Sequence, residues 1–320
     1  MDNDYSFFIG DVALDEYYRA PYWPKISDKV LVEILKPQMG GSIANAASVY
    51  NAYNESVYFL SLLNSGKITQ SLLTDLQKQG IDTSYVLYDD SLPDAKNIIV
   101  LAEGEHTLII PTLGIQQIEI TQEIIDAMCK AKYVYTTIGE IRPLRCGNMN
   151  AIDIIKKVRE SGAKMVYDLD VGHIEAGDEL FFKEMDIVFF NQIGFDVYRK
   201  DSSDEEAISQ LLSYGTEVVV VTHAEEGCSV HTKDQTVFVE GIPVDVVDVT
   251  GAGDTFCSSF IYALNKCNNL IMVANFANAA AARSVTIMGA RGGISSSEVV
   301  LDFMRGKGLE PSREYNCFIE

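Results

Sequence analysis

The sequence has few basic residues and no cysteine motif. It contains 25 Lys and Arg against 46 Asp and Glu, which gives a net charge of −21. Such an acidic surface repels the phosphate backbone of nucleic acids and anionic lipid headgroups, so neither is expected as a partner. None of the six cysteines forms a CxxC pair, and no His–Cys cluster has the spacing of a zinc site. We therefore expect reduced thiols and no structural zinc.

Long apolar runs are also missing. No run approaches the roughly 18 apolar residues of a membrane-spanning helix, and residues 1–4 read MDND where a signal peptide would be basic. We expect a cytoplasmic protein that does not interact with membranes. The 320 residues are 47% hydrophobic, and no repeat or linker-like segment divides them. They suffice for one large core with a small appended part.

Short apolar runs alternate with longer amphipathic stretches along the chain. This alternation predicts a mostly parallel sheet with helices on both faces, and such sheets bind ligands at the carboxyl ends of their strands. The expected strands are residues 5–9, 57–62, 133–137, 164–167, 187–190 and 217–221. The main expected helices are residues 43–52, 68–79, 149–160, 205–213, 255–264 and 270–286.

Two segments interrupt the alternation. Residues 15–36 are rich in aromatic side chains and contain two prolines, and residues 97–110 alternate around an EGE turn that predicts a β-hairpin. Together they would form a small sheet, which is either a lid over a ligand site or an ordinary edge hairpin. The aromatic stretch 17–23 suits stacking on a bulky ligand or packing against another subunit, and we favour the second.

The most informative motif is DVTGAGDTF, at residues 248–256. It follows an apolar, strand-like run at residues 244–247 and precedes an apolar helix. A glycine-rich turn that opens a helix lets the backbone approach a ligand and directs free N–H groups at it. Gly251, Ala252 and Gly253 would thus form an anion hole. Asp254 would accept the proton of an attacking hydroxyl, although an isolated aspartate there is as typical of a helix N-cap.

This run resembles the C-terminal signature of the ribokinase-like (PfkB) carbohydrate kinases, D-T-T-G-A-G-D-x-F or a close variant. A second block, MGGSIANAA at residues 39–47, resembles the family's N-terminal signature G-G-x-x-x-N-x-A. The resemblance covers nearly the whole chain. It implies a three-layer α/β/α ribokinase-like core with a mostly parallel central sheet, plus a small β-sheet lid. The core would comprise residues 1–14, 37–94 and 112–320, and the lid residues 15–36 and 95–111.

The resemblance implies ATP-dependent phosphorylation of a primary hydroxyl of a sugar or sugar-like molecule, with Asp254 as the base. It also implies Mg²⁺ with ATP, an activating K⁺, and a homodimer formed through the lid. The substrate-binding residues would be Asp15, Gly40, Gly41 and Asn45. The nucleotide-binding residues would be Asn191, Thr222, Gly227 and Asn278. The K⁺ ligands would include Asp248 and Thr250.

Three positions depart from the family pattern. The glutamate that usually lies three residues after Asn191 is Gly194, with Asp196 or a water as a substitute; a Thr-x-Gly turn ends in Ala224; and an Asp-x-Asn motif ends in Asp170. These changes affect Mg²⁺ geometry and nucleotide affinity rather than the base. They leave open a weak or inactive sugar- or nucleotide-binding protein on the same fold, and the acceptor could also be a nucleoside. The Gly-Ala-Gly turn lacks the rest of a dinucleotide fingerprint, which disfavours a dehydrogenase.

Other polar residues give weaker signals. Histidines are more often surface or satisfied polar residues than catalytic ones. Of the four histidines here, His106 on the hairpin is the best candidate for a substrate contact. Arg142, Arg145 and Lys96 could meet an anionic substrate, but an exposed charge is the commoner explanation. Ribose, fructose derivatives, 2-keto-3-deoxy acids and nucleosides all remain as candidate acceptors.

Overall fold

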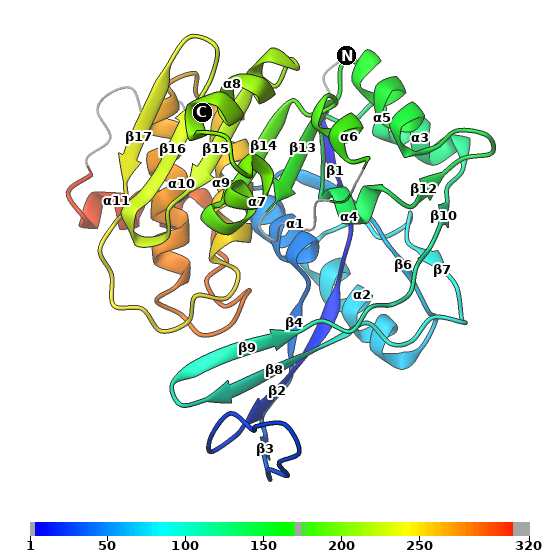
Figure 1. The fold of residues 1–320 in the computed structure, drawn as a ribbon, viewed down its shortest axis with the longest axis vertical. Helices are drawn as coiled ribbons and strands as arrows, with labels where there is room; N and C mark the ends of the chain where they lie inside the picture. The colour runs from blue at the N-terminus through cyan, green and yellow to red at the C-terminus, as the bar shows by residue number, and fades with distance from the viewer. Residues whose placement is uncertain (1–3, 170–174, 176, 310–320) are drawn as a thin grey trace.

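A computed structural model describes residues 4–169, 175 and 177–309. An eight-stranded sheet lies at the centre (Figure 1). Its first six strands in spatial order are parallel, and the last two are antiparallel. This confirms the predicted α/β fold class. In spatial order the strands are β5 (Ser56–Leu60), β1 (Tyr5–Ile9), β11 (Tyr133–Thr136), β13 (Lys164–Leu169), β14 (Ile187–Asn191), β15 (Val218–Thr222), β16 (Gly227–His231) and β17 (Thr236–Glu240).

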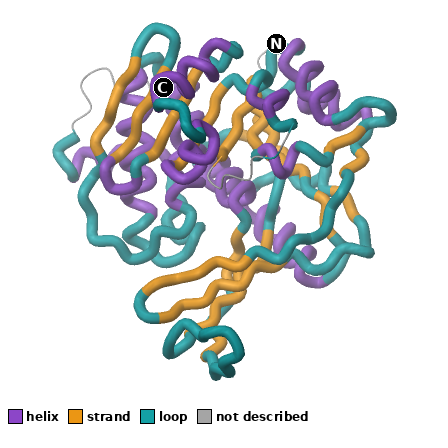
Figure 2. The backbone as a smooth tube through the Cα atoms, in the orientation of Figure 1, coloured by secondary structure: helices purple, strands orange, loops and turns teal. Residues whose placement is uncertain are grey.

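Helices cover both faces of this sheet (Figure 2). Successive residues of a strand point to opposite faces, so Phe8 and Phe189 pack in one apolar cluster while Phe7 and Val188 pack in the other. The first face carries α1 (Ser42–Ala52), α2 (Lys67–Gln79), α9 (Ala252–Lys266), α10 (Leu270–Ser284) and α11 (Ser297–Gly306). The second carries α3 (Gln122–Met128), α4 (Ile138–Ile141), α5 (Ala151–Glu160), α6 (Glu179–Phe182), α7 (Gln192–Arg199) and α8 (Asp204–Ser213). Within the described residues, no helix is long and apolar enough to cross a membrane.

A separate five-stranded sheet projects from the body (Figure 1). The predicted hairpin is confirmed, because β8 and β9 pair across a turn in which Glu103 and Gly104 have φ of 55° and 86°. Most of this sheet falls within the predicted lid segments 15–36 and 95–111. Its strands are β2 (Ala13–Arg19), β3 (Glu33–Ile34), β4 (Gln38–Gly40), β8 (Lys96–Ala102) and β9 (Glu105–Ile109). Two short pairs complete the strands, β6 (Leu62–Leu63) with β7 (Leu87–Tyr88) and β10 (Ile118–Glu119) with β12 (Leu144–Arg145).

The strand expected at residues 244–247 was a wrong prediction. This segment has no regular structure, and Val246 and Val247 are 60% and 54% exposed. The edge of the sheet is already formed by β17, so the run has no strand to pair with. The backbone N–H groups of Val247 and Asp248 instead bond the carbonyl of Val285, just after α10.

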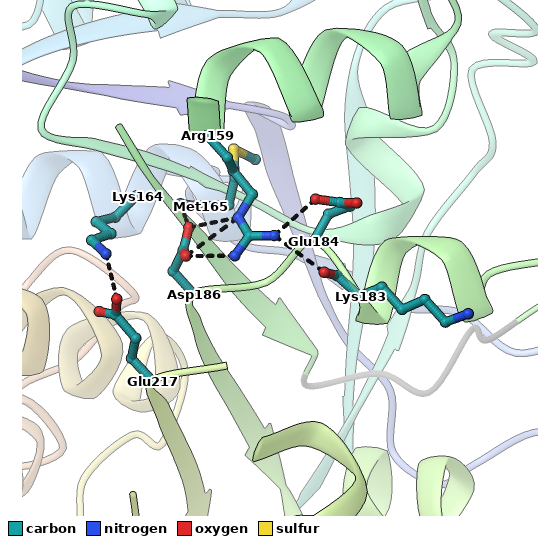
Figure 3. Close-up of polar contacts among 7 residues, drawn as sticks. All are labelled: Arg159, Lys164, Met165, Lys183, Glu184, Asp186 and Glu217. Carbon is teal, nitrogen blue, oxygen red and sulfur yellow. Dashed lines mark hydrogen bonds and ion pairs between the residues drawn. The ribbon is translucent and has the colours of Figure 1, made fainter. Parts of the chain in front are cut away.

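A partly buried ion-pair network ties α5 to the amino-terminal ends of strands β13 and β14 (Figure 3). The guanidinium of Arg159 bonds Asp186 at 2.9 Å, Glu184 at 2.8 Å and the carbonyl of Lys183 at 3.1 Å. Asp186 also accepts a hydrogen bond from the backbone N–H of Met165 at 2.8 Å. These charges therefore satisfy one another and serve the fold.

Candidate active site

Asp254 lies where the two sequence signatures meet. It occupies the first turn of α9, and its carboxylate accepts hydrogen bonds from Ser42 Oγ at 2.7 Å and Asn45 Nδ2 at 2.9 Å. Both donors belong to the first turn of α1, which packs against α9 on the same face of the sheet. The structure thus brings the predicted base and the predicted sugar-binding asparagine into direct contact.

The two glycines of the turn before Asp254 have different roles. Gly251 has φ of 77°, and a Cβ there would lie 2.5 Å from the carbonyl oxygen of Ala290, so only glycine fits. A Cβ on Gly253 would meet nothing within 4 Å, which leaves the backbone open to a ligand. The N–H of Ala252 already donates to the carbonyl of Val249 at 3.2 Å. The next N–H groups at the start of α9 have no intrahelical acceptors, and the helix dipole is positive there. The turn is therefore suited to bind an anion beside Asp254.

Asp15 and the two glycines Gly40 and Gly41 form the base of the small sheet. Asp15 is 4% exposed and accepts a hydrogen bond from Asn97 Nδ2 at 2.9 Å. A Cβ on Gly40 would lie 2.0 Å from Asp15 Oδ2, and one on Gly41 would lie 2.6 Å from the Cα of Val12. Burial raises the pKa of Asp15, although the bond from Asn97 opposes the shift. The glycine pair is needed because these backbones and side chains approach so closely.

Arg291 is a site residue that the sequence analysis missed. It donates from Nε to Asn45 Oδ1 at 2.8 Å, from Nη1 to Asp75 at 2.8 Å, and from Nη2 to the carbonyl of Gly40 at 2.9 Å. Its side chain is only 10% exposed. Because Asn45 Oδ1 accepts from Arg291, its Nδ2 is left to face Asp254. A lone arginine within the glycine-rich segment GARGG was the only sequence signal for this role.

Asp11 and Glu140 are two further carboxyl groups that were missed. Asp11 follows β1 and accepts hydrogen bonds from the backbone N–H groups of Ser42 and Ile43, both at 3.0 Å, so it holds the start of α1. A Cβ on Gly10 would lie 2.9 Å from Glu140 Cγ, which places Glu140 beside this segment. Burial and the neighbouring Asp11 raise the pKa of Glu140 to about 8.

The raised pKa of Glu140 predicts a pH-dependent effect on stability. The ordinary pKa of this group is 4.5, so between pH 4.5 and about 8 the folded protein holds a proton that the unfolded chain has lost. Stability must therefore fall as pH rises through this range. In Glu140→Gln this loss is absent, so the melting temperature of the variant relative to wild type should increase between pH 5 and pH 9. A constant difference at pH 5, 7 and 9 would contradict the assignment.

The predicted nucleotide-side residues gather at the ends of β14 to β17. Asn191 and Thr222 end adjacent strands and are paired in register. The Asn191 side chain accepts a hydrogen bond from the N–H of Gly194 at 2.7 Å and so caps α7. These two residues face the same edge of the sheet as the α9 turn.

Gly227 and Asn278 lie beside them, around the edge hairpin. Gly227 begins β16 opposite Glu240, and a Cβ there would lie 2.1 Å from the carbonyl oxygen of Val239. The buried Asn278 on α10 donates to the carbonyls of Val239 and Glu240 at 3.2 and 3.1 Å. Gly227 therefore permits the close approach of β16 and β17, and Asn278 holds this hairpin against α10. Their contact with a nucleotide stays a prediction.

Comparison with known proteins decides the family. Residues 5–297 match the model of the pfkB family carbohydrate kinases. The chain belongs to this family. The family membership confirms the predicted resemblance and the class of enzyme, a carbohydrate kinase.

The individual relatives share low sequence identity with this chain, from 16% to 25%. The 5-dehydro-2-deoxygluconokinase of Clostridium perfringens is 25% identical over 292 residues, which cover 83% of this chain and 84% of that protein. The structure of Arabidopsis thaliana ribokinase complexed with ribose and ATP has a TM-score of 0.81 and 21% identity, and covers 94% of this chain and 99% of that one. A putative ribokinase II from E. coli in complex with ATP and Mg²⁺ has a TM-score of 0.76 and 16% identity, and covers 95% and 99%. These structures confirm the ribokinase-like fold.

At Gly194, where the chain departs from the pfkB pattern, the neighbouring backbone leaves no room for a side chain. A Cβ at this position would lie 2.0 Å from the carbonyl oxygen of Leu169. Gly194→Glu should therefore lower stability by about 1–3 kcal/mol, as overpacking does, without strengthening Mg²⁺ dependence. Thermal unfolding and Mg²⁺ titration of activity measure both effects, and Ile193→Glu is the control because Ile193 is 69% exposed in the same helix. A fully stable Gly194→Glu variant would show that Leu169 can move aside.

Asp248 braces the loops on either side of the turn. One carboxylate oxygen accepts from Thr250 N at 3.0 Å and Thr250 Oγ1 at 2.7 Å, and the other accepts from Gly289 N at 2.8 Å. Both carboxylate oxygens of Asp248 are therefore already engaged by donors of the two loops, and K⁺ binding beside Asp248 and Thr250 stays a prediction. The described residues contain no group of three or more His, Cys, Asp or Glu side chains that could hold a metal ion. Mg²⁺ would then be held mainly through phosphate oxygens and water.

The cationic residues considered for an anionic substrate all have protein partners. Arg142 bonds Glu175 and Asp178, Arg145 bonds the carbonyls of Arg142 and Leu144, and Lys96 pairs with Glu16. His106 lies exposed on β9. Asp170, which ends the Asp-x-Asp motif, and His173, one of the four histidines, lie outside the described residues.

Proposed function

We propose that the protein transfers the γ-phosphoryl group of ATP to a primary hydroxyl of a sugar or sugar-like molecule, with Asp254 as the general base. The observation that carries this proposal is the position of Asp254. Its carboxylate is held by Ser42 and Asn45 at the opening of α9, beside the open backbone of Gly253.

The arrangement explains how the chemistry would proceed. Two donors fix the carboxylate, and hydrogen bonds to a carboxylate favour its charged form. It would accept the proton of the attacking hydroxyl while Gly251, Ala252 and Gly253 meet the negative charge of the transferred group with backbone N–H groups. Asp15 and Asn45, with the backbone of Gly40 and Gly41, would hold the remaining hydroxyls of the acceptor.

The nucleotide would lie across the ends of β14 to β17. Its binding residues would be Asn191, Thr222, Gly227 and Asn278. Mg²⁺ bound with ATP would neutralise phosphate charge. K⁺ beside Asp248 and Thr250 would fix the two loops that frame the turn. A cytoplasmic location, and the absence of nucleic-acid and membrane partners, stay predictions.

An acceptor screen tests the proposal. Purified protein is incubated with ATP, Mg²⁺ and single sugars or nucleosides, and ADP release is followed by a coupled assay. ADP release that needs both Mg²⁺ and an acceptor supports the kinase. The second candidate is a non-catalytic sugar- or nucleotide-binding protein, which Gly194 favours because it replaces the family's glutamate. Calorimetric binding of ATP and a sugar without any ADP release would favour that candidate.

The lid is proposed to join two copies of the chain. It exposes an apolar patch, defined as Trp23, Ile26, Leu31 and Ile34, which are 45%, 99%, 95% and 77% exposed. Large apolar side chains exposed close together in sequence are typical of interaction sites. The double change Leu31→Lys and Ile34→Lys should convert a dimer into a monomer in light scattering after size exclusion. Leu180→Lys, at a 53% exposed site on α6, should leave the mass unchanged; a monomeric wild type would contradict the proposal.

A further inference from the structure

Carboxyl groups dominate the part of the site where the acceptor would bind. Ser42 joins two of them, because its backbone N–H bonds Asp11 while its hydroxyl bonds Asp254. Asp15 lies against Gly40, and its pKa is raised by burial and then by the charge of Asp11. Glu140 lies beside Gly10 and Asp11. Four carboxyl groups from four different elements therefore surround the first turn of α1.

The cation that contacts this group is already engaged. The three guanidinium nitrogens of Arg291 each donate to the protein, to Asn45, Asp75 and Gly40, and little of the side chain is exposed. Asp75 pairs with its charge directly, and the same charge also attracts Asp15 and Asp254. Lys96, at the base of the lid, lies opposite Leu14 in register and so is on the sheet face away from Asp15, where it pairs with Glu16. No cation among these residues is left to bind an acidic ligand.

Glu140 indicates the electrostatic potential of this space. Both burial and the charge of Asp11 disfavour the charged form of its carboxyl group. The carboxylate of a ligand would lose water and meet the same charges. A sugar hydroxyl would instead donate to these groups, which accept hydrogen bonds when ionised. Tyr17, on the same lid face as Asp15, adds a buried hydroxyl without a partner in the described part of the chain.

We propose that the acceptor is a sugar without a carboxylate or phosphate group. This inference rests on the proposed kinase function and concerns the same site. It selects uncharged sugars over the sugar acids among the candidate acceptors. The structural reason is that carboxyl groups and an uncharged tyrosine hydroxyl line the site, whereas the guanidinium of its arginine donates to protein partners.

Binding and turnover of two matched panels test the inference. The uncharged panel contains ribose, fructose and glucose, and the acidic panel contains gluconate and 2-keto-3-deoxygluconate. Calorimetry with a non-hydrolysable ATP analogue and Mg²⁺ measures Kd, and ADP release measures kcat/KM. The best uncharged sugar should exceed the best acid by about 100-fold in both quantities, since like-charge contacts are strongly unfavourable. Equal or tighter binding of an acid, or no binding of any sugar, overturns it; binding without ADP release counts against the kinase instead.

A charge-removing variant tests the cause. In Glu140→Gln, measured at pH 9 where wild-type Glu140 is ionised, the discrimination against acids should shrink by roughly tenfold, because one like charge is removed at nearly constant shape. Glu205→Gln is the control, since Glu205 is exposed on α8 outside the site. An unchanged ratio in Glu140→Gln, with calorimetry confirming that the variant binds ATP, would contradict the proposed role of the carboxylates.

Discussion

Replacement of Asp254 by asparagine should lower kcat by about 10²–10⁴-fold, while the Kd for ATP changes by no more than a few fold. Asparagine preserves the shape of the side chain but cannot accept the proton of the attacking hydroxyl, and general bases typically contribute in this range. The backbone N–H groups of residues 251–253 are untouched, so the site for the transferred phosphoryl group remains. A coupled ADP-release assay gives kcat, and calorimetry gives the Kd.

The control for this variant removes a carboxylate elsewhere. Asp234→Asn, on the exposed turn between β16 and β17, should leave both quantities unchanged. Turnover of Asp254→Asn close to that of wild type would show that Asp254 only caps α9, which was the alternative that the sequence left open.

Replacement of Arg291 by methionine should lower kcat/KM by about 100-fold, which is the scale expected when a catalytic group is misplaced by about 1 Å. Methionine keeps much of the apolar volume but removes the donors to Asn45, Asp75 and Gly40. Asn45 could then rotate its amide and present Oδ1 to the carboxylate of Asp254, which is repulsive. Steady-state kinetics on the best acceptor measure the loss.

Two further measurements separate positioning from a general loss of folding. Arg305→Met removes an exposed arginine of α11 and should be kinetically silent. A double-mutant cycle with Asn45→Ala should be strongly non-additive, because Arg291 acts through Asn45. Additive losses, or a melting-temperature drop that alone explains the lost activity, would contradict a positioning role for Arg291.

The sequence predicted the parts of this site that depend on local backbone chemistry. The run at residues 248–256 contains both the glycine with positive φ and the acidic residue at the helix start, so Gly251 and Asp254 could be assigned without tertiary information. The glycines before α1 were predicted for the same reason. The alternation of strands and helices gave the parallel part of the sheet, since each βα unit buries its own apolar face.

The missed residues are those whose roles exist only in the tertiary structure. Arg291 is 246 residues from its partner Asn45, and the sequence around Arg291 does not show that Asn45 is near. Glu140 looks like an ordinary polar residue until the close approach of Gly10 is known. The strand predicted before the turn failed for a related reason, because its apolar pattern could not show that β17 had already formed the sheet edge.

A crystal structure with a non-hydrolysable ATP analogue, Mg²⁺ and the acceptor bound tests the role of Asp254 directly. An acceptor hydroxyl should lie within about 3 Å of the Asp254 carboxylate, with the terminal phosphate facing the backbone N–H groups of residues 251–253. A terminal phosphate bound away from this turn, or an acceptor hydroxyl that Asp254 does not reach, would contradict the central claim.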